Sequence, residues 1–291
     1  MGLASVQDGG RPGGRHEGVP QGGFADATAA ALANALVGRL PGAPLLEFAL
    51  ATATLQITRE TTVAFAGATA SVTVDGKAVP FLRRLKLRAG AELRITGPYR
   101  GRYLYLALAR LGSPGALPVW RRSVSPLRLG AEYYPPGSIL QAGSRLPFED
   151  TPSYAFQPGG AFSLLPAHPD VFEFTEAPET AWYADWISGS RFGVPRFSET
   201  LFFVDPSSDR TGVRLRHHLG ARLLPVLPDR HLPRSSPTLP GTVQVLPKGD
   251  LIASLVDGPT MGGYPRVGHL GPTMRSALAQ ATGPIRLRLV S

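Results

Sequence analysis

Short apolar stretches with the alternation typical of β-strands recur along most of this sequence, and glycine or proline ends most of them within a few residues. The clearest case is residues 70–74, which run into Asp75-Gly76 before residues 78–81 return. A two-residue Asp-Gly connection between apolar runs predicts a β-hairpin. With 34 Gly and 29 Pro in 291 residues, turns are too frequent for long helices. We therefore predict a mainly β fold of many short strands.

The same patterns place the other elements. Further strands are expected at residues 63–65, 85–87, 93–95, 103–108, 171–174, 201–204, 242–245, 251–256 and 285–290. One helix should follow the N-cap residue Asp26 and end at Gly38, and a second should cover residues 273–281. Residues 1–25 are predicted to be a Gly-rich loop.

The chain is long enough for two domains. Residues 148–169 are rich in Pro, Ser and Gly, as expected for a linker or an ordered loop. We expect an N-terminal β-barrel subdomain at residues 1–150, a linker at 151–170 and a C-terminal β-barrel subdomain at 171–291. Closure into barrels is expected because it removes exposed sheet edges.

Composition excludes several classes of function. The net charge is +9, but the arginines are spread out and form no long basic run, so we expect no nucleic-acid partner. Without cysteine there is no disulfide and no cysteine nucleophile. The histidines lack a ligand spacing, so no metal site is expected. No apolar run reaches the roughly 18 residues of a membrane span, and the polar N-terminus predicts no signal peptide. We expect a cytoplasmic protein without a membrane partner.

The stretch 257–265, D-G-P-T-M-G-G-Y-P, concentrates groups that can do chemistry. Asp257 can act as a general base, and the Gly262-Gly263 step can take positive φ and bring backbone N–H groups close to a carbonyl oxygen. The alternative is an Asx-type turn in which Asp257 caps its own loop. Thr260 and Tyr264 complete the candidate site.

Two further groups of charged residues can be interpreted either as ligand-binding sites or as structural ion pairs. Arg11 with Asp8 can hold a carboxylate or phosphate, or the two can form an ion pair that pins the loop. The cluster 208–214 can neutralise an anionic intermediate, or can be a structural network in which Asp209 satisfies an arginine locally. The amides Gln7, Asn34 and Gln244 are of a type that is more often buried and bonded to backbone.

Several groups of residues occur in the order and spacing of one known family. They are Gln7, Asp8, Gly10, Arg11, Gly18, Val19, Pro20, Gly23, Asp26, Ala33, Asn34, Leu36, Val37 and Gly38; Leu46 and Glu47; Ser208, Asp209, Arg210, Gly212, Arg214 and Leu215; and Ser235, Pro237, Gly241, Gln244, Val245, Asp257, Thr260, Gly262, Gly263, Tyr264 and Pro265. On these residues the chain resembles the family of the 5-oxoprolinase C subunit, urea amidolyase, allophanate hydrolase subunit 2 and the kinase-inhibitor antagonist of sporulating bacteria. The resemblance covers nearly the whole chain.

The middle of the chain departs from the family pattern. Of the family's G-S-R-S-T, residues 119–124 keep only Arg122 and Ser123, and the glycine-rich stretch that should follow is absent. Residues 137–140 lack the Asp of G-D-x-L, and Tyr103 stands where the family has Arg. These departures bear on whether the chain is catalytically competent, and they leave the expected fold unchanged.

The resemblance implies two cyclophilin-like β-barrel subdomains with minor helices. It implies one component of the ATP-dependent 5-oxoprolinase, which opens 5-oxo-L-proline to L-glutamate together with proteins like the enzyme's B and A subunits. ATP is expected on a partner or at an interface, because the sequence has no P-loop. No Met-Lys-Met is present, so no biotin should be attached to this chain.

The resemblance also implies roles for residues. The implied catalytic residues are Asp257, Thr260, Tyr264 and Asp8. The implied substrate-binding residues are Gln7, Arg11, Asp26, Asn34, Arg122, Ser208, Asp209, Arg210, Arg214, Gln244, Gly262 and Gly263.

Two alternatives stay open beside a lactam- or amide-hydrolysing enzyme. The first is an antagonist-type protein that binds a partner like the B subunit without turnover, which the departures in the middle favour. The second is the carboxyltransferase component of a biotin-dependent urea or amide carboxylase, which would need a separate biotin carrier.

Overall fold

The computed structural model describes residues 2–11, 13–109, 111, 139–146, 171–175, 201–217, 234–247 and 249–290. The chain divides into two compact units. The first unit comprises Met1–Pro12 and Gly22–Ser163, and the second comprises Gly13–Gln21 and Leu164–Ser291. Strands dominate both units and the described residues hold two α-helices, so the mainly β prediction is confirmed. The predicted linker at 151–170 and the departing motif at 119–124, with Arg122, lie outside the described residues.

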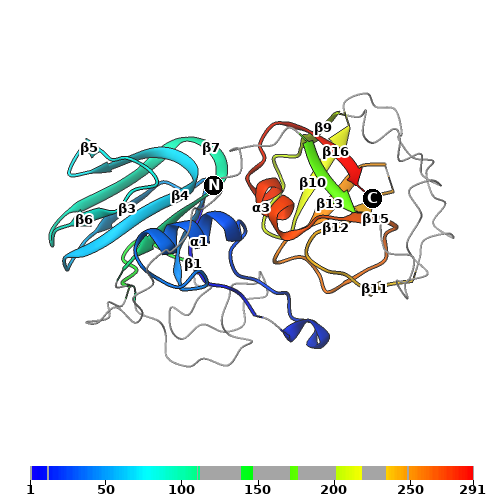
Figure 1. Cartoon of the computed structure of the whole chain (residues 1–291), viewed down its shortest axis with the longest axis horizontal. Coiled ribbons are helices and arrows are strands. Elements are labelled where there is room, and N and C mark those ends of the chain that lie inside the picture. Colours follow the sequence, from blue (N-terminus) through cyan, green and yellow to red (C-terminus); the bar gives the residue numbers. More distant parts are fainter. Residues whose placement is uncertain are drawn as a thin grey trace. The chain divides into compact units, whose positions relative to one another are not determined.

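The first unit is built on one seven-stranded antiparallel sheet, curled in the blue to teal part of Figure 1. Its strands pair in the order β1-β2-β7-β4-β5, with β3 added on β7 and β6 added on β4. Their bounds are β1 (Leu3–Gln7), β2 (Leu45–Ala49), β3 (Ala53–Gln56), β4 (Thr61–Val74), β5 (Lys77–Ala78), β6 (Leu85–Leu87) and β7 (Glu92–Leu108).

One face of this sheet carries the hydrophobic core of the unit. On β7 the cluster takes every second residue, Leu104, Leu106 and Leu108, while Tyr105 and Ala107 between them are buried on the other face. The largest fully buried members of the cluster are Phe48, Phe65, Leu46, Leu93 and Ile95. Asp75 and Gly76 both take positive φ, at 49° and 77°, and connect β4 to β5. The predicted hairpin is thus confirmed.

Two predictions for this unit were wrong in detail. Residues 93–95 and 103–108 are one continuous strand, in which two register shifts opposite Gly67–Ser71 accommodate extra residues of β7. Residues 1–25 are not all loop, since β1 pairs with β2 along its whole length. Glycine-rich neighbours conceal this short strand, in which Ser5, Val6 and Gln7 are buried.

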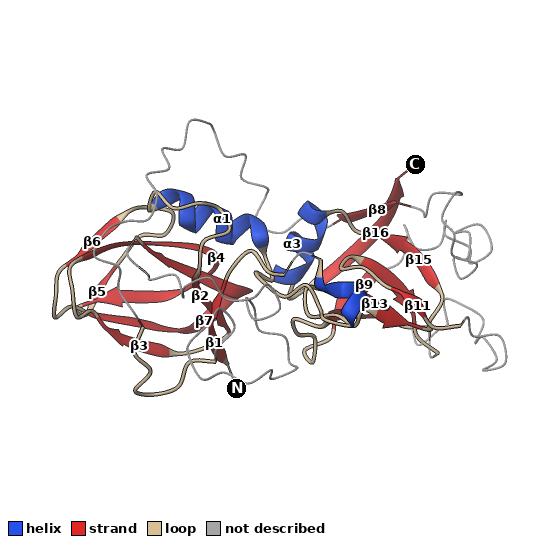
Figure 2. Ribbon diagram, turned by 90° about the horizontal axis from the view of Figure 1, so that it is seen from below, coloured by secondary structure: helices blue, strands red, loops and turns tan. Residues whose placement is uncertain are grey.

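Helix α1 (Ala27–Leu36) begins where the sequence predicts it. The Asp26 carboxylate accepts a hydrogen bond from the Ala29 amide at 3.0 Å. The helix contacts β4 and β7, and Figure 2 shows it lying along the sheet. Alanines form most of the buried surface, whereas Leu32 and Leu36 are only partly buried. Small side chains let the helix approach the sheet closely.

The second unit is a closed barrel with the strand order β10-β13-β12-β15-β8-β16-β9, so closure is found here. All of its pairs are antiparallel except β16 with β8. Its strands are β8 (Val171–Thr175), β9 (Leu201–Val204), β10 (Gly212–His217), β12 (Thr242–Val245), β13 (Leu251–Ser254), β15 (Arg266–His269) and β16 (Pro284–Val290).

Three smaller elements complete this unit. The 3-10 turn η1 (Gly14–Glu17) comes from the N-terminal part of the chain. Strands β11 (Ser236–Pro237) and β14 (Met261–Gly262) form a separate two-stranded pair. Helix α3 (Pro272–Gln280) has Pro272 in its first turn, within one residue of the predicted start.

Candidate functional site

The predicted site residues fall into two sets, one in each unit. The first unit holds Gln7, Asp8, Arg11, Asp26 and Asn34. The second holds Ser208, Asp209, Arg210, Arg214, Gln244, Asp257, Thr260, Gly262, Gly263 and Tyr264.

In the first unit, the polar residues after β1 are buried. Gln7 is fully buried and donates from Nε2 to the Ser5 hydroxyl at 3.1 Å. The Asp8 carboxylate accepts the Gly10 amide at 2.8 Å, and Arg11 is only 2% exposed. A Cβ at Gly23 would lie 2.8 Å from the Asp8 carbonyl oxygen, so the loop before α1 packs directly on this segment. The arrangement is a tightly packed polar loop.

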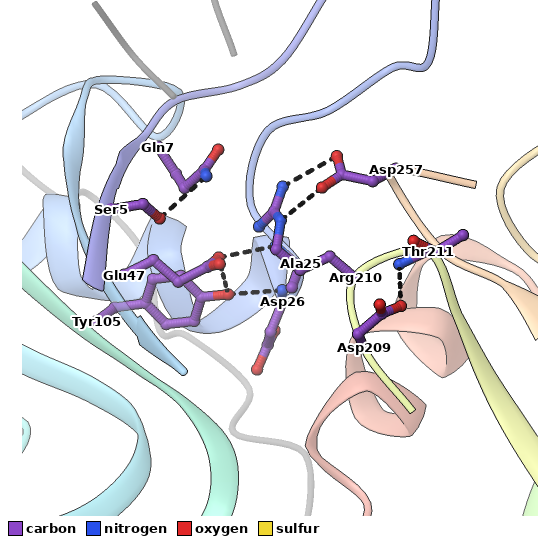
Figure 3. A network of polar contacts seen from close by, with 10 residues as sticks. All are labelled: Ser5, Gln7, Ala25, Asp26, Glu47, Tyr105, Asp209, Arg210, Thr211 and Asp257. Carbon is purple, nitrogen blue, oxygen red and sulfur yellow. Dashed lines mark hydrogen bonds and ion pairs between the residues drawn. The ribbon is translucent and has the colours of Figure 1, made fainter. Parts of the chain in front are cut away.

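Next to this loop is a buried network that the sequence analysis did not predict. The Tyr105 hydroxyl on β7 donates to Glu47 Oε2 at 2.9 Å and accepts the Asp26 amide at 2.7 Å. Glu47 Oε2 also accepts the Ala25 amide at 3.0 Å. Figure 3 shows the Tyr105 hydroxyl between the Glu47 carboxylate and Asp26. Glu47 and Tyr105 thereby satisfy two backbone N–H groups at the start of α1.

Burial determines the chemistry of this network. Tyr105 is completely buried, and this desolvation, reinforced by the charge of Glu47, raises the pKa of its phenol well above the ordinary value. The hydroxyl is therefore a neutral hydrogen-bond donor at neutral pH. A signal was available in the sequence: Glu47 is the one charged residue in the otherwise apolar stretch L-L-E-F-A.

Asn34 has a structural position on α1. It is completely buried, and its amide group donates to the carbonyl oxygens of Pro41 and Ala43 at 3.2 and 2.8 Å. This matches the interpretation of a buried amide bonded to backbone, and it ties the helix end to the segment that enters β2.

In the second unit, the central feature is a buried ion pair. Arg210 donates from Nε to Asp257 Oδ2 at 2.7 Å and from Nη2 to Oδ1 at 3.2 Å. The two residues are 8% and 4% exposed. The Asp257 amide also donates to the Arg210 carbonyl at 3.0 Å. Figure 3 shows the guanidinium facing the carboxylate in a two-pronged arrangement.

This pair corrects two of the local interpretations. Asp209 does not satisfy a neighbouring arginine: its carboxylate accepts the Thr211 amide at 2.7 Å, which is an Asx-type turn. Asp257 does not merely cap its own loop, since its carboxylate pairs with an arginine 47 positions earlier. Nearby, the Ser208 hydroxyl accepts the Arg214 amide at 3.0 Å, and the Arg214 side chain is exposed on β10.

The absence of a side chain at the Gly262-Gly263 step leaves room for neighbouring side chains to pack against the backbone. Neither glycine takes positive φ, contrary to the prediction. A Cβ at Gly262 would lie 2.6 Å from Gln244 Nε2 and 2.9 Å from Thr238 Cγ2, so only glycine lets these side chains lie against the strand. The Gln244 amide in turn donates to the Tyr264 carbonyl at 3.4 Å.

The comparison with known proteins identifies the family. The model of the carboxyltransferase domain, subdomains A and B, matches residues 17–290. The chain belongs to this family. It is 32% identical over 273 residues to the C subunit of 5-oxoprolinase from Escherichia coli (strain K12), which corresponds to 91% of this chain and 80% of that protein. The resemblance read from the sequence is thus confirmed.

Two solved structures share the fold of this chain. The structure of TTHA0988 aligns with a TM-score of 0.75 and 30% identity over all of this chain, which spans only about half (53%) of that chain. The urea amidolyase of Kluyveromyces lactis aligns with a TM-score of 0.79 over 99% of this chain and 18% of its own length. At 23% identity, this second likeness shows a shared fold.

In this carboxyltransferase-domain chain, the candidate residues differ in what a ligand can reach. Arg210 and Asp257 are buried against each other, whereas Tyr264 is 38% exposed and Thr260 is partly exposed. The buried pair is suited to holding the loop, and the two hydroxyls are suited to contacting a small molecule. Within the described ranges, no cluster of three or more His, Asp or Glu forms a metal site, and no helix has the length and apolarity to cross a bilayer.

Proposed function

We propose that this chain is the counterpart of the C subunit in an ATP-dependent 5-oxoprolinase, which opens 5-oxo-L-proline to L-glutamate together with proteins like the B and A subunits. The observation that carries the proposal is the 32% identity to a protein named as the C subunit of 5-oxoprolinase, over 91% of this chain. The family model, which matches residues 17–290, covers every candidate residue of the second unit.

Ring opening breaks the lactam C–N bond. Water adds to the carbonyl carbon, and the nitrogen leaves with a proton as the amine of glutamate. Exposed hydroxyl donors can stabilise the charge that develops on the carbonyl oxygen. In this proposal Tyr264 and Thr260 contact the substrate, and Asp257 acts through Arg210 by holding the loop that carries them.

Among the candidate residues of the second unit, all of which the structure describes, no cluster of cationic groups fits the triphosphate of ATP. The sequence has no P-loop. In the second unit, Arg210 is engaged by Asp257, and Arg214 is the exposed candidate arginine. One exposed arginine is too little for a triphosphate. We therefore place ATP on a partner protein and derive no step through it.

The test is glutamate release from 5-oxo-L-proline and ATP by this chain co-purified with its partners, the counterparts of the B and A subunits. A preparation without this chain is the first control, and an Arg83→Ala complex, altered at an exposed arginine of the first unit, is the second. We expect release that requires this chain and survives Arg83→Ala, but falls roughly tenfold or more in Tyr264→Phe. Equal release with and without this chain would refute the proposal.

A carboxyltransferase role is the second candidate, favoured by the family match and by the fold shared with urea amidolyase. It predicts carboxyl transfer from a carboxylated biotin carrier to urea or another amide, without glutamate formation. The antagonist-type alternative predicts a stable complex with the counterpart of the B subunit and neither reaction. Running both assays on the same complex separates the three.

A further inference from the structure

Arg15 on η1 contacts the loop that carries the candidate hydroxyls. Its Nη2 donates to the carbonyl oxygens of Thr238 and Pro259, the second at 3.1 Å. Thr238 directly follows β11, and Pro259 directly precedes Thr260. One guanidinium therefore joins two segments that lie more than 220 positions further along the chain.

The same two segments are joined to each other at this point. The Thr238 amide donates to the Thr260 carbonyl at 2.8 Å, and the Thr238 hydroxyl donates to the Pro259 carbonyl at 2.6 Å. Thr238 is 1% exposed. The Pro259 carbonyl thus accepts both a buried hydroxyl and Arg15, so its orientation is set from two sides.

The turn that presents Arg15 is tightly defined. Gly13 and Gly18 flank η1 with φ values of 88° and 79°, which favour glycine. The Gly18 amide donates to the Arg15 carbonyl at 3.0 Å, and His16 Nδ1 lies 2.6 Å from the Gly13 carbonyl. A turn closed in this way presents its arginine in a limited range of positions.

The electrostatics of Arg15 differ from those of a surface ion pair. In the described parts of the chain it has no carboxylate partner, and the groups it contacts are carbonyl oxygens. Partial burial lowers the pKa of its guanidinium from the ordinary value. A charged, partly desolvated side chain directed at two carbonyl dipoles is better explained by holding those carbonyls than by pairing charge.

We propose that Arg15 is a positioning residue for the reaction of the second unit: it holds the Pro259–Thr260 segment and Thr238 so that Thr260 and Tyr264 face the substrate. This inference rests on the proposed function for its catalytic part, whereas its structural part stands independently. Lysine carries its ammonium on a stem that is shorter than the arginine side chain, so it can reproduce only part of the arrangement.

The structural part is tested by hydrogen–deuterium exchange on the isolated protein. We expect Arg15→Ala to raise exchange about tenfold or more in peptides covering 236–241 and 257–264, because the bond from Thr238 to Thr260 opens more often. Arg15→Lys should fall between, and Arg83→Ala should match the wild type. Peptides from β12 and β13 report whether the barrel is still folded. Unchanged exchange in Arg15→Ala with a folded barrel would overturn the inference.

The catalytic part is tested by steady-state kinetics of the reconstituted complex. Because small misplacements of catalytic groups are costly, Arg15→Ala should lower kcat roughly tenfold or more. Added guanidinium ion at millimolar concentration should recover part of that loss, which general instability would not show. A kcat within twofold of the wild type would refute the positioning role. A wild-type complex that releases no glutamate would refute the proposed function, and the exchange result would still decide how Arg15 acts on the loop.

Discussion

The two units show two ways of stabilising a buried carboxylate. In the first unit, Glu47 is 1% exposed and accepts hydrogen bonds from a neutral phenol and a backbone amide. In the second, Asp257 is 4% exposed and faces the guanidinium of Arg210. Tyr105 is thus a neutral partner of its carboxylate, whereas Arg210 is a charged one.

The difference has consequences for how each site tolerates change. A neutral donor such as Tyr105 costs little to remove beyond its own hydrogen bonds, because its removal leaves no new charge unbalanced. Removing one member of an ion pair leaves the other buried without that compensation. Substitution of Asp257 should therefore lower the free energy of unfolding more than substitution of Tyr105 does. At a pH at which phenols ionise, Tyr105 should in turn have the larger influence on the pH dependence of stability.

The largest expected effect comes from breaking the ion pair. Asp257→Ala removes the carboxylate that holds both Nε and Nη2 of the buried Arg210 and should destabilise the second unit by up to about 3–5 kcal/mol. Urea unfolding followed by a probe in the barrel measures it. The double variant Arg210→Met/Asp257→Leu should lose clearly less than the sum of the single losses.

The matched control is a pair on the surface of the first unit. Arg88 and Asp75 are 3.0 Å apart, but their side chains are 71% and 38% exposed. Removing Arg88 should leave the unfolding midpoint close to that of the wild type, because exposed pairs contribute little. If Asp257→Ala were equally mild, the contrast drawn between the two units would be wrong.

A smaller loss is expected from Tyr105→Phe. The substitution keeps the ring, which packs edge-on against Phe24 at 6.2 Å between centroids, and removes the hydroxyl between Glu47 and the Asp26 amide. Buried groups left unsatisfied cost about 1–3 kcal/mol, so the first unit should be destabilised by that amount. Chemical denaturation measures the change, and a loss as large as that of Asp257→Ala would contradict the distinction between neutral and charged partners.

Local signals in the sequence predicted most of the elements. The Asp26 cap and the Asp75-Gly76 turn each depend on residues within four positions, and both are present in the structure. The strands β9 and β12 have the predicted bounds. Such features are set by local backbone preferences, which a single sequence displays directly.

The side-chain pairs in the candidate sites could not be predicted from local sequence signals. Glu47 and Tyr105 are 58 positions apart, and Arg210 and Asp257 are 47 apart. The sequence showed that Arg210 and Asp257 carry opposite charges, but Asp209 offered a nearer partner. Whether Arg210 reaches the near or the far carboxylate depends on the pairing of β10 with β13, which is a tertiary property. Arg15 was missed for the same reason.

Alkaline pH should weaken the protein through its buried phenols. Desolvation raises the pKa of Tyr105 well above the ordinary value and that of Tyr99, which donates to the Ala51 carbonyl, to about 12. In the unfolded chain both ionise near pH 10. As pH rises from about 10, the unfolded state loses protons before the folded state does, so stability falls.

The slope is at most about 1.4 kcal/mol per pH unit for a fully buried group such as Tyr105, and less for Tyr99, which is partly exposed to solvent. The slope is obtained by measuring unfolding between pH 9 and about 12. Absorbance titration of tyrosinate, carried out in parallel, follows the ionisation of the phenols. The slope should decrease in Tyr105→Phe and remain in Asp257→Ala. A slope unaffected by Tyr105→Phe would show that the phenol is not protected as described.

The smallest expected effect concerns helix capping, in which helices α1 and α3 differ. Helix α1 has the Asp26 carboxylate as its cap, whereas α3 follows Gly271, which makes no side-chain cap and has φ −60° and ψ 165°. A Cβ at Gly271 would meet nothing within 4 Å, so a side chain fits there.

Gly271→Asp should stabilise the second unit by a few tenths of a kcal/mol, through a new cap and the favourable charge at the helix start. Gly271→Ala, which adds the Cβ without the acceptor, should give no gain. Thermal unfolding compares the two, and equal shifts would mean that chain stiffening, not capping, is responsible.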